Sequence, residues 1–462
     1  MSRLLEDAAH RAMVYLDQLS TRQVAPSPEA IAKLSALDQP LPERSTDPGE
    51  VLKQLDELIS PATMAMAGPR FYGFVIGGSI PITLAANWLA GAWDQNTAYY
   101  NATPGTAVLE QIAIRWLLDL FGLPREAGAA FVSGATMANF SALATARHAV
   151  LMATGWNVEA NGLFGAPPIT VIIGAEAHPS LIKSLGMLGL GRNRVVKVPV
   201  DSQGCMRPDA FPAISGPTIV CTQAGNVNSG AFDPIGEICD LAHRSGAWVH
   251  VDGAFGLWAM TVPSMQNLTS GLNKADSWAT DFHKWLNVPY DSGVAFVCDS
   301  EALRAAMAVT AEYLPTASPY RNPSDFVPEL SRRARGVEVW AALRTLGRSG
   351  VVEMIERNCR QARRFAQGLQ AAGYEVLNDV VLNQVLVSFG DPETTNRVIA
   401  GIQLDGTCWC GGTVWHGRTA MRISVSSWAT TDEDVERSLE AMINVARQVA
   451  NVHTSANREV SV

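Results

Sequence analysis

Long apolar runs, blocks of basic residues and paired cysteines are all missing from this 462-residue chain. No uncharged apolar run reaches the ~20 residues that a membrane helix needs. The charged start MSRLLEDAAHRAMVYLDQL lacks the apolar core of a secretory signal. Lysine and arginine number 35 against 44 acidic residues, a net charge of −9, which argues against a nucleic-acid partner. We therefore expect a cytoplasmic protein that binds neither nucleic acid nor a membrane.

The seven cysteines are scattered, and an odd number argues against a closed set of disulfides. One residue separates Cys408 from Cys410, which is not the usual zinc spacing. We expect buried or partly buried thiols and no metal site.

The hydrophobic fraction of 47% supplies material for a large core, and the length predicts two or three domains. Residues 1–60 are expected to be helical, with Ser27 as an N-cap before Pro28. This segment is expected to pack on a partner subunit, although packing on its own chain is equally compatible. A large domain over residues 61–315 and a smaller C-terminal α/β domain over residues 330–455 are expected to follow.

Short apolar, β-branched runs alternate with helical patterns in the large domain. The predicted strands lie at 129–134, 170–175, 194–200, 218–223, 248–253 and 292–298, with helical patterns at 137–155 and 235–246 between them. Apolar strands separated by helices are typical of a mostly parallel sheet covered on both faces. Ligands of such sheets bind at the carboxyl ends of the strands.

Two charged residues in apolar surroundings are candidates for chemistry. Lys284 lies in the apolar segment ATDFHKWL, and a desolvated lysine amine forms imines with carbonyl compounds. A surface lysine with a buried stem is the plainer interpretation. Asp252 ends the run WVHVD, and a carboxylate there needs a partner such as a protonated pyridine nitrogen. A helix N-cap or a loop aspartate is the alternative.

Small and imidazole side chains mark other strand ends. Ser133-Gly134-Ala135-Thr136 joins a strand to a helix, where backbone N–H groups and hydroxyls bind phosphate, or it is an ordinary turn. His178 follows another strand and is suited to stack on an aromatic ring or simply to form hydrogen bonds. His283, beside Lys284, faces the phosphate or is structural. Each signal is weak alone, but their order along one sheet indicates a single site.

Seven stretches of the chain resemble the group II pyridoxal-phosphate decarboxylases, the family of aromatic amino-acid, glutamate, histidine and cysteine-sulfinate decarboxylases. These are FYGFVIGGSIPITLAANWL, TPGTAVLEQIAIRWLLDLFGLP, FVSGATMANFSALATAR, AGNVNSGAFDPI, WVHVDGAFG, DFHKWLNVPYDSG and SRRARGVEVWAALRTLG. The resemblance implies fold type I of the transferases that use pyridoxal 5′-phosphate (PLP). This α/β fold has a mostly parallel seven-stranded sheet in the large domain. A homodimer with shared active sites is implied as well.

The resemblance also assigns roles to single residues. Lys284 matches the Schiff-base lysine, Asp252 the partner of the pyridine nitrogen, and His178 the catalytic residue that stacks on the ring. The other matches to cofactor-binding residues are Ser133, Gly134, Ala135, Thr136, Asn228, Ala254 and His283. The matches to substrate-binding residues are Phe74, Ser79 and Arg422.

The activity that the resemblance implies is removal of the α-carboxylate of an L-amino acid, giving an amine and CO₂. An aldehyde synthase, which also deaminates oxidatively, and another PLP activity such as transamination or C–C lysis stay open. In this family a tyrosine on a mobile loop protonates the substrate carbon, and we predict Tyr320 for this role, with Tyr313 as the alternative.

The chain also departs from the family's pattern. Asn226-Val227 stands where the family has Thr-Thr, and Ile80 replaces an aromatic residue. These changes predict altered cofactor contacts and a different substrate pocket. Phe71, Tyr72, Phe74 and Trp88 are expected either to line that pocket or to lie in the core.

Overall fold

The computed structural model describes residues 1–309 and 320–459, with side chains to residue 451. The chain separates into two compact units, each described by itself. The larger unit comprises Gly77–Arg363 and Asn378–Val385, and the smaller comprises Met1–Ile76, Arg364–Leu377 and Leu386–Val462. The predicted division at residues 60, 315 and 330 stays a prediction.

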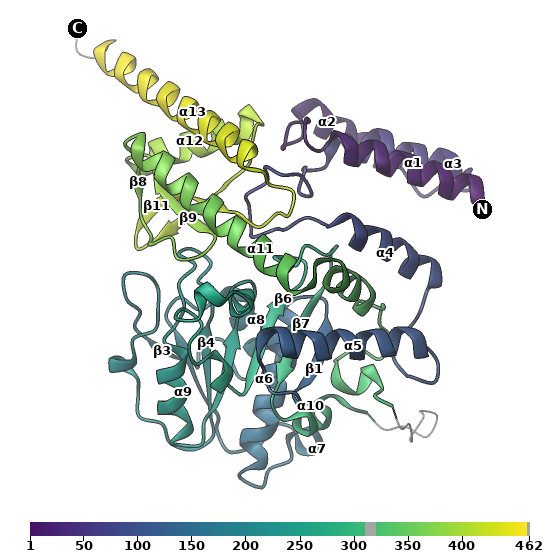
Figure 1. Cartoon of the computed structure of the whole chain (residues 1–462), viewed down its shortest axis with the longest axis vertical. Coiled ribbons are helices and arrows are strands. Elements are labelled where there is room, and N and C mark those ends of the chain that lie inside the picture. Colours follow the sequence, from purple (N-terminus) through teal and green to yellow (C-terminus); the bar gives the residue numbers. More distant parts are fainter. Residues whose placement is uncertain (310–319, 460–462) are drawn as a thin grey trace. The chain divides into compact units, whose positions relative to one another are not determined.

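The larger unit is built on a central sheet (Figure 1). This sheet has seven strands in the order β1-β7-β6-β5-β4-β2-β3. Its strands are β1 (Gly128–Val132), β2 (Thr170–Gly174), β3 (Val196–Val198), β4 (Thr218–Gln223), β5 (Trp248–Asp252), β6 (Ser277–Asp281) and β7 (Gly293–Val297). Strands β3, β2, β4, β5 and β6 run parallel, and β7 is antiparallel to both of its neighbours. The prediction of a mostly parallel seven-stranded sheet is confirmed.

The larger unit also contains helices, some of which cover the strands. They are α4 (Pro81–Trp93), α5 (Pro104–Phe121), α6 (Ala135–Met152), α7 (Val158–Asn161), α8 (Pro179–Met187), α9 (Ile235–His243), α10 (Ser300–Met307) and the first part of α11 (Gly336–Ala371). On β1, Ala130 and Val132 pack with the alanines of α6. On neighbouring β7, Phe296 meets Phe121 of α5 edge to face. Because β1, β6 and β7 are buried along their whole length, the sheet is covered on both faces.

Strand β6 is the one strand of this sheet that the sequence analysis missed. Its sequence, SWATD, carries three polar residues, so it lacks the apolar run by which the others were found. Pairing with β5 and β7 nevertheless buries all five residues. The hydrogen bonds of the sheet satisfy the polar backbone, so polar side chains there need only local partners.

The smaller unit combines helices with a four-stranded sheet in the order β10-β11-β9-β8. Its strands are β8 (Glu375–Val376), β9 (Gln384–Ser388), β10 (Gly411–Trp415) and β11 (Arg418–Ser424), and its helices are α1 (Ser2–Gln18), α2 (Pro28–Ala32), α3 (Pro48–Gln54), α12 (Pro392–Asp405) and α13 (Asp432–Glu459). Ser27 caps α2 by accepting a hydrogen bond from the N–H of Ala30, as predicted.

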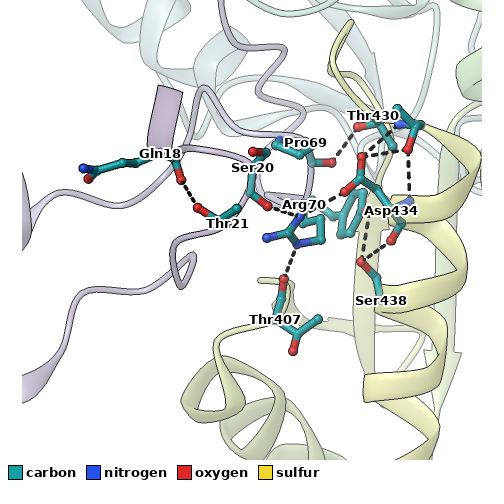
Figure 2. A network of polar contacts seen from close by, with 11 residues as sticks. Gln18, Ser20, Thr21, Pro69, Arg70, Thr407, Thr430, Asp434 and Ser438 are labelled. Atoms are coloured by element: carbon teal, nitrogen blue, oxygen red, sulfur yellow. Dashed lines mark hydrogen bonds and ion pairs between the residues drawn. The ribbon is translucent and has the colours of Figure 1, made fainter. Parts of the chain in front are cut away.

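Arg70 fixes the segment that leads out of the N-terminal helices (Figure 2). Its buried guanidinium donates to the carbonyls of Ser20 and Thr407 and to Asp434 Oδ1, at 2.9, 2.7 and 3.0 Å. Thr430 adds a hydrogen bond to the carbonyl of Pro69. These contacts therefore fix the start of the segment that contains Phe71, Tyr72 and Phe74.

Candidate functional site

Asp252 ends β5 with its carboxylate almost fully buried, 4% exposed. Oδ2 accepts a hydrogen bond from Asn139 Nδ2 at 3.1 Å, and Oδ1 accepts one from the N–H of Ala254 at 3.3 Å. Among the described residues no cation pairs with this carboxylate. A buried negative charge without a cation is costly, so this carboxylate suits a positively charged ligand.

A small cavity lies at this end of the sheet. Its lining includes Asp252, His178, Glu176, Thr222 and Gln223. The cavity thus brings together two predicted site residues from different strand ends.

His178 is held by its own helix. Nδ1 accepts a hydrogen bond from the N–H of Ser180 at 3.2 Å, capping α8, and lies 2.7 Å from Ser180 Oγ. Because the lone pair of Nδ1 serves as the cap, the proton of the neutral ring is on Nε2.

Gly134 occupies the turn between β1 and α6, where no larger residue fits. A Cβ there would lie 2.9 Å from His283 Cε1 and 3.1 Å from Asp281 Oδ1. The next residue, Ala135, donates its N–H to Asp281 Oδ1 at 2.5 Å. The start of α6 therefore meets the end of β6 directly, with the positive end of the helix beside a carboxylate.

Lys284 extends toward the same carboxylate. Its Nζ lies 3.0 Å from Asp281 Oδ2, and its side chain is 18% exposed. Gly77 passes so close that a Cβ would meet the Lys284 carbonyl oxygen at 1.9 Å, and the N–H of Ile80 donates to the carbonyl of Asn287 at 2.8 Å. The segment that contains Ser79 is thereby fixed against the loop that carries the lysine.

His283 lies on the other side of Asp281. Its Nε2 is 3.4 Å from Asp281 Oδ1, its Nδ1 accepts from the N–H of Ser292 at 3.1 Å, and its ring stacks on Tyr290. Burial, the largest cause, lowers the pKa of His283. The hydroxyl of Ser292 is itself buried and has no hydrogen-bond partner among the described residues.

Two residues of this constellation escaped the sequence analysis. Asp281 ends β6 as Asp252 ends the neighbouring β5, and that shared strand-end position is the signal that could have found it. Asn139 lies inside α6, fully buried, where nothing in the local sequence marks it as a partner of Asp252.

The other predicted residues lie further out or in the smaller unit. In the larger unit, the N–H of Asn228 donates to Asn226 Oδ1 at 2.8 Å, and Tyr320 is 52% exposed and stacks on Tyr100 at 4.0 Å. Tyr313 lies outside the described residues.

In the smaller unit, Phe74 is 58% exposed near Trp409, and Arg422 lies on β11, where burial lowers its pKa. Phe71 and Tyr72 belong to the core, whereas Trp88, in the larger unit, is exposed.

The residues present fit PLP by the charge and the hydrogen-bonding groups that they offer. Asp252 matches a protonated ring nitrogen, the glycine turn at α6 gives a phosphate access to helix N–H groups, and Lys284 supplies an amine. The unpartnered hydroxyl of Ser292, next to His283, is one more donor of the kind that a phosphate needs.

No three His, Cys, Asp or Glu side chains gather to hold a metal ion within residues 1–309 and 320–451. Cys408 and Cys410 are buried free thiols, as predicted. No described helix is long and apolar enough to cross a membrane.

Comparison with known proteins gives a consistent result. The family described as the pyridoxal-dependent decarboxylase conserved domain matches residues 28–390. The aromatic-L-amino-acid decarboxylase of Bacillus atrophaeus is 26% identical over 398 residues, 83% of this chain and 81% of that protein. The L-2,4-diaminobutyrate decarboxylase of Rhizobium meliloti is 28% identical over 442 residues, 90% of this chain and 85% of that protein.

Solved structures share the fold. TDC of Oryza sativa, crystallised with PLP and tryptamine, superposes with a TM-score of 0.88 at 22% identity, over 97% of both chains. Mouse CSAD superposes with a TM-score of 0.89 at 21% identity, over 96% of this chain and 98% of that chain. At these identities the likeness establishes the architecture alone.

Proposed function

The chain belongs to the pyridoxal-dependent decarboxylase family and is a PLP-dependent amino-acid decarboxylase. From this premise we propose a role in cofactor binding or catalysis for each of the site residues. One observation carries the proposal. The adjacent parallel strands β5 and β6 end in the buried carboxylates of Asp252 and Asp281, and Lys284 contacts the second of these. When bound, PLP supplies the electron sink that receives the electron pair left at Cα when CO₂ departs.

Asp281 is proposed to prepare Lys284 for attachment of the cofactor. An ammonium must lose a proton before its nitrogen can attack a carbonyl carbon. Asp281 Oδ2, 3.0 Å from Lys284 Nζ, is proposed to hold the ammonium in position until its proton is lost on attachment of the cofactor. Near-complete burial of Asp281 strengthens this interaction relative to a surface pair.

Other residues are proposed to bind the remaining parts of the cofactor. Asp252 would keep the ring nitrogen protonated, and His178, fixed as the cap of α8, would stack on the ring. The N–H groups at the start of α6 and the side chains of Ser133, Thr136 and His283 would hold the phosphate. Since the N–H of Ala135 already donates to Asp281, the phosphate would be bound mainly by the remaining helix N–H groups and by these side chains. Asn228 and Ala254 are proposed to contact the cofactor as well.

The substrate is proposed to be an amino acid, and Arg422 is proposed to bind its carboxylate. Phe74 and Ser79 are proposed as further substrate-binding residues on the strength of the family resemblance. A guanidinium forms paired hydrogen bonds to a carboxylate. Tyr320 is proposed to protonate Cα, because the family's proton-donating tyrosine lies on the corresponding loop and the Tyr320 side chain is half exposed. A decarboxylase with this acid releases amine rather than aldehyde.

The test is a screen of the common L-amino acids for CO₂ release, with amine, aldehyde, ammonia and keto acid measured in parallel. The proposal expects amine and CO₂ in equal amounts from at least one amino acid. Aldehyde with ammonia and peroxide would replace it by the aldehyde-synthase alternative, and keto acid would indicate transamination.

A homodimer is proposed from exposed apolar surface. Helix α1 contains no buried residue, although Leu5, Met13 and Val14 lie on it. In the larger unit, α4 and α5 expose Ile82, Trp88, Leu89, Trp93, Val108 and Trp116. Large apolar side chains exposed on helices are typical of surfaces that a partner subunit covers.

Sedimentation velocity should find a dimer, and deletion of residues 1–60 should weaken it and lower activity. A fully active monomer would contradict the dimer. The predicted cytoplasmic location stays a prediction, which cell fractionation would test.

A further inference from the structure

Behind Asp252 lies a buried row of polar side chains that the reaction itself does not use. Asn139 Nδ2 donates to Asp252 Oδ2, and Asn139 Oδ1 lies 2.9 Å from His250 Nε2. His250 Nδ1 lies 2.9 Å from Ser277 Oγ, which accepts a hydrogen bond from Trp248 Nε1 at 2.9 Å. Asn139, His250 and Ser277 are fully buried.

The directions of these hydrogen bonds follow from chemistry. An ionised carboxylate only accepts, so the amide of Asn139 must turn its NH₂ group toward Asp252 and its oxygen toward His250. His250 must then carry its proton on Nε2, leaving Nδ1 to accept from the hydroxyl of Ser277. The indole of Trp248 can only donate, which completes the row.

His250 remains neutral in this setting. Burial lowers its pKa to about 3. The residue in register with His250 on the adjacent strand β4 is Cys221, whose thiol pKa is raised by burial, so it too is uncharged. Every donor in the row therefore points toward the one negative charge, and aligned hydrogen bonds strengthen one another.

We propose that Trp248, Ser277, His250 and Asn139 form a one-directional hydrogen-bond chain that holds the Asp252 carboxylate in the correct orientation, with Asn139 as the key positioning residue. The proposal rests on the proposed role of Asp252 toward the pyridine nitrogen of PLP. The residues of the chain come from β5, β6 and α6, so the sheet and its covering helix together fix this carboxylate.

The test is a double-mutant cycle read by the dissociation constant of PLP, measured from cofactor absorbance. Asn139→Leu has similar volume and removes the charge-assisted hydrogen bond, so it should weaken PLP binding about 10-fold to 100-fold. In an Asp252→Asn background the same change should shift binding by no more than about threefold, because the charge that it supports is gone.

Two further variants make the cycle decisive. Ser277→Ala interrupts the chain two residues beyond Asn139 and should weaken PLP binding by a smaller factor. This variant also tests the proposal if Asn139→Leu fails to fold. Thr145→Val is the matched control, because Thr145 is buried in the same helix and its hydroxyl donates to the carbonyl of Ser141, its one partner among the described residues. It should bind PLP like the wild type.

Equal effects of Asn139→Leu in both backgrounds would show a merely structural residue and overturn the chain. Wild-type protein in which borohydride fixes no PLP on Lys284 would overturn the proposed function instead, so the two failures are distinguishable. A PLP affinity of Ser277→Ala and Asn139→Leu equal to that of Thr145→Val would also refute the proposal.

Discussion

The buried neutral imidazole of His250 predicts a specific loss of stability in acid. A histidine in an unfolded chain titrates near pH 6.5, whereas the pKa of His250 in the fold is lowered to about 3 by burial. Between these values the unfolded state binds one proton more than the native state. The free energy of unfolding therefore falls as pH decreases from 6.5 toward 3, by about 1.4 kcal/mol per pH unit.

The perturbation that isolates this effect is His250→Gln, which keeps a neutral polar side chain but cannot be protonated. From pH 7 to pH 5 the wild type should lose about 2 kcal/mol that the variant does not lose. The variant is expected to be less stable than the wild type at pH 7, because its contacts to Asn139 and Ser277 are imperfect. The difference should shrink as pH falls.

The assay is urea unfolding at pH 7, 6 and 5, at one protein concentration so that association contributes equally. Other titrating groups cancel in the comparison. One is Asp233, whose pKa is raised to about 6 by burial and which is present in both proteins. Parallel pH profiles for wild type and variant would refute the neutral, buried His250 and the hydrogen-bond directions derived from it.

Three further substitutions have defined outcomes. Glu110→Gln should cost about 3–5 kcal/mol in urea unfolding, because it removes the charge 2.7 Å from the fully buried guanidinium of Arg332. Adding Arg332→Met should recover most of that loss, and a persistent deficit would contradict the argument. Asp252→Asn should fold and bind PLP weakly while turnover falls about 100-fold, as for loss of one electrostatic stabiliser, and near-wild-type turnover would remove its role. Tyr320→Phe should shift product from amine to aldehyde and peroxide, whereas unchanged amine output would place the acid elsewhere.

The sheet could be predicted from sequence because most of its strands are continuous apolar runs. The strand TVIIG and the strand GVAFV are buried on both faces and carry almost no polar side chains. SWATD could not be found in this way, since Ser277, Thr280 and Asp281 become acceptable inside the sheet only through partners from other elements.

The same distinction between local and distant signals applies to the residues of the site. Asp252 is visible in the sequence because its charge ends an apolar run, and Lys284 is visible because it is a cation in an apolar neighbourhood. Their supporting partners are not visible, because the contacts are distant along the chain. Asn139 is 113 residues from Asp252, and Ala135 is 146 residues from Asp281. Only the folded sheet, with α6 packed across it, brings these pairs within hydrogen-bond distance.

The central claim is that Lys284 holds the cofactor, and borohydride reduction followed by peptide mapping tests it most directly. Reduction of the PLP-loaded protein should abolish the cofactor's visible absorbance and leave one pyridoxyl group on the peptide DFHKWLNVPY, at Lys284. Lys284→Ala should bind PLP without retaining label. Label recovered on another lysine, or no stable label on the wild type, would contradict the account.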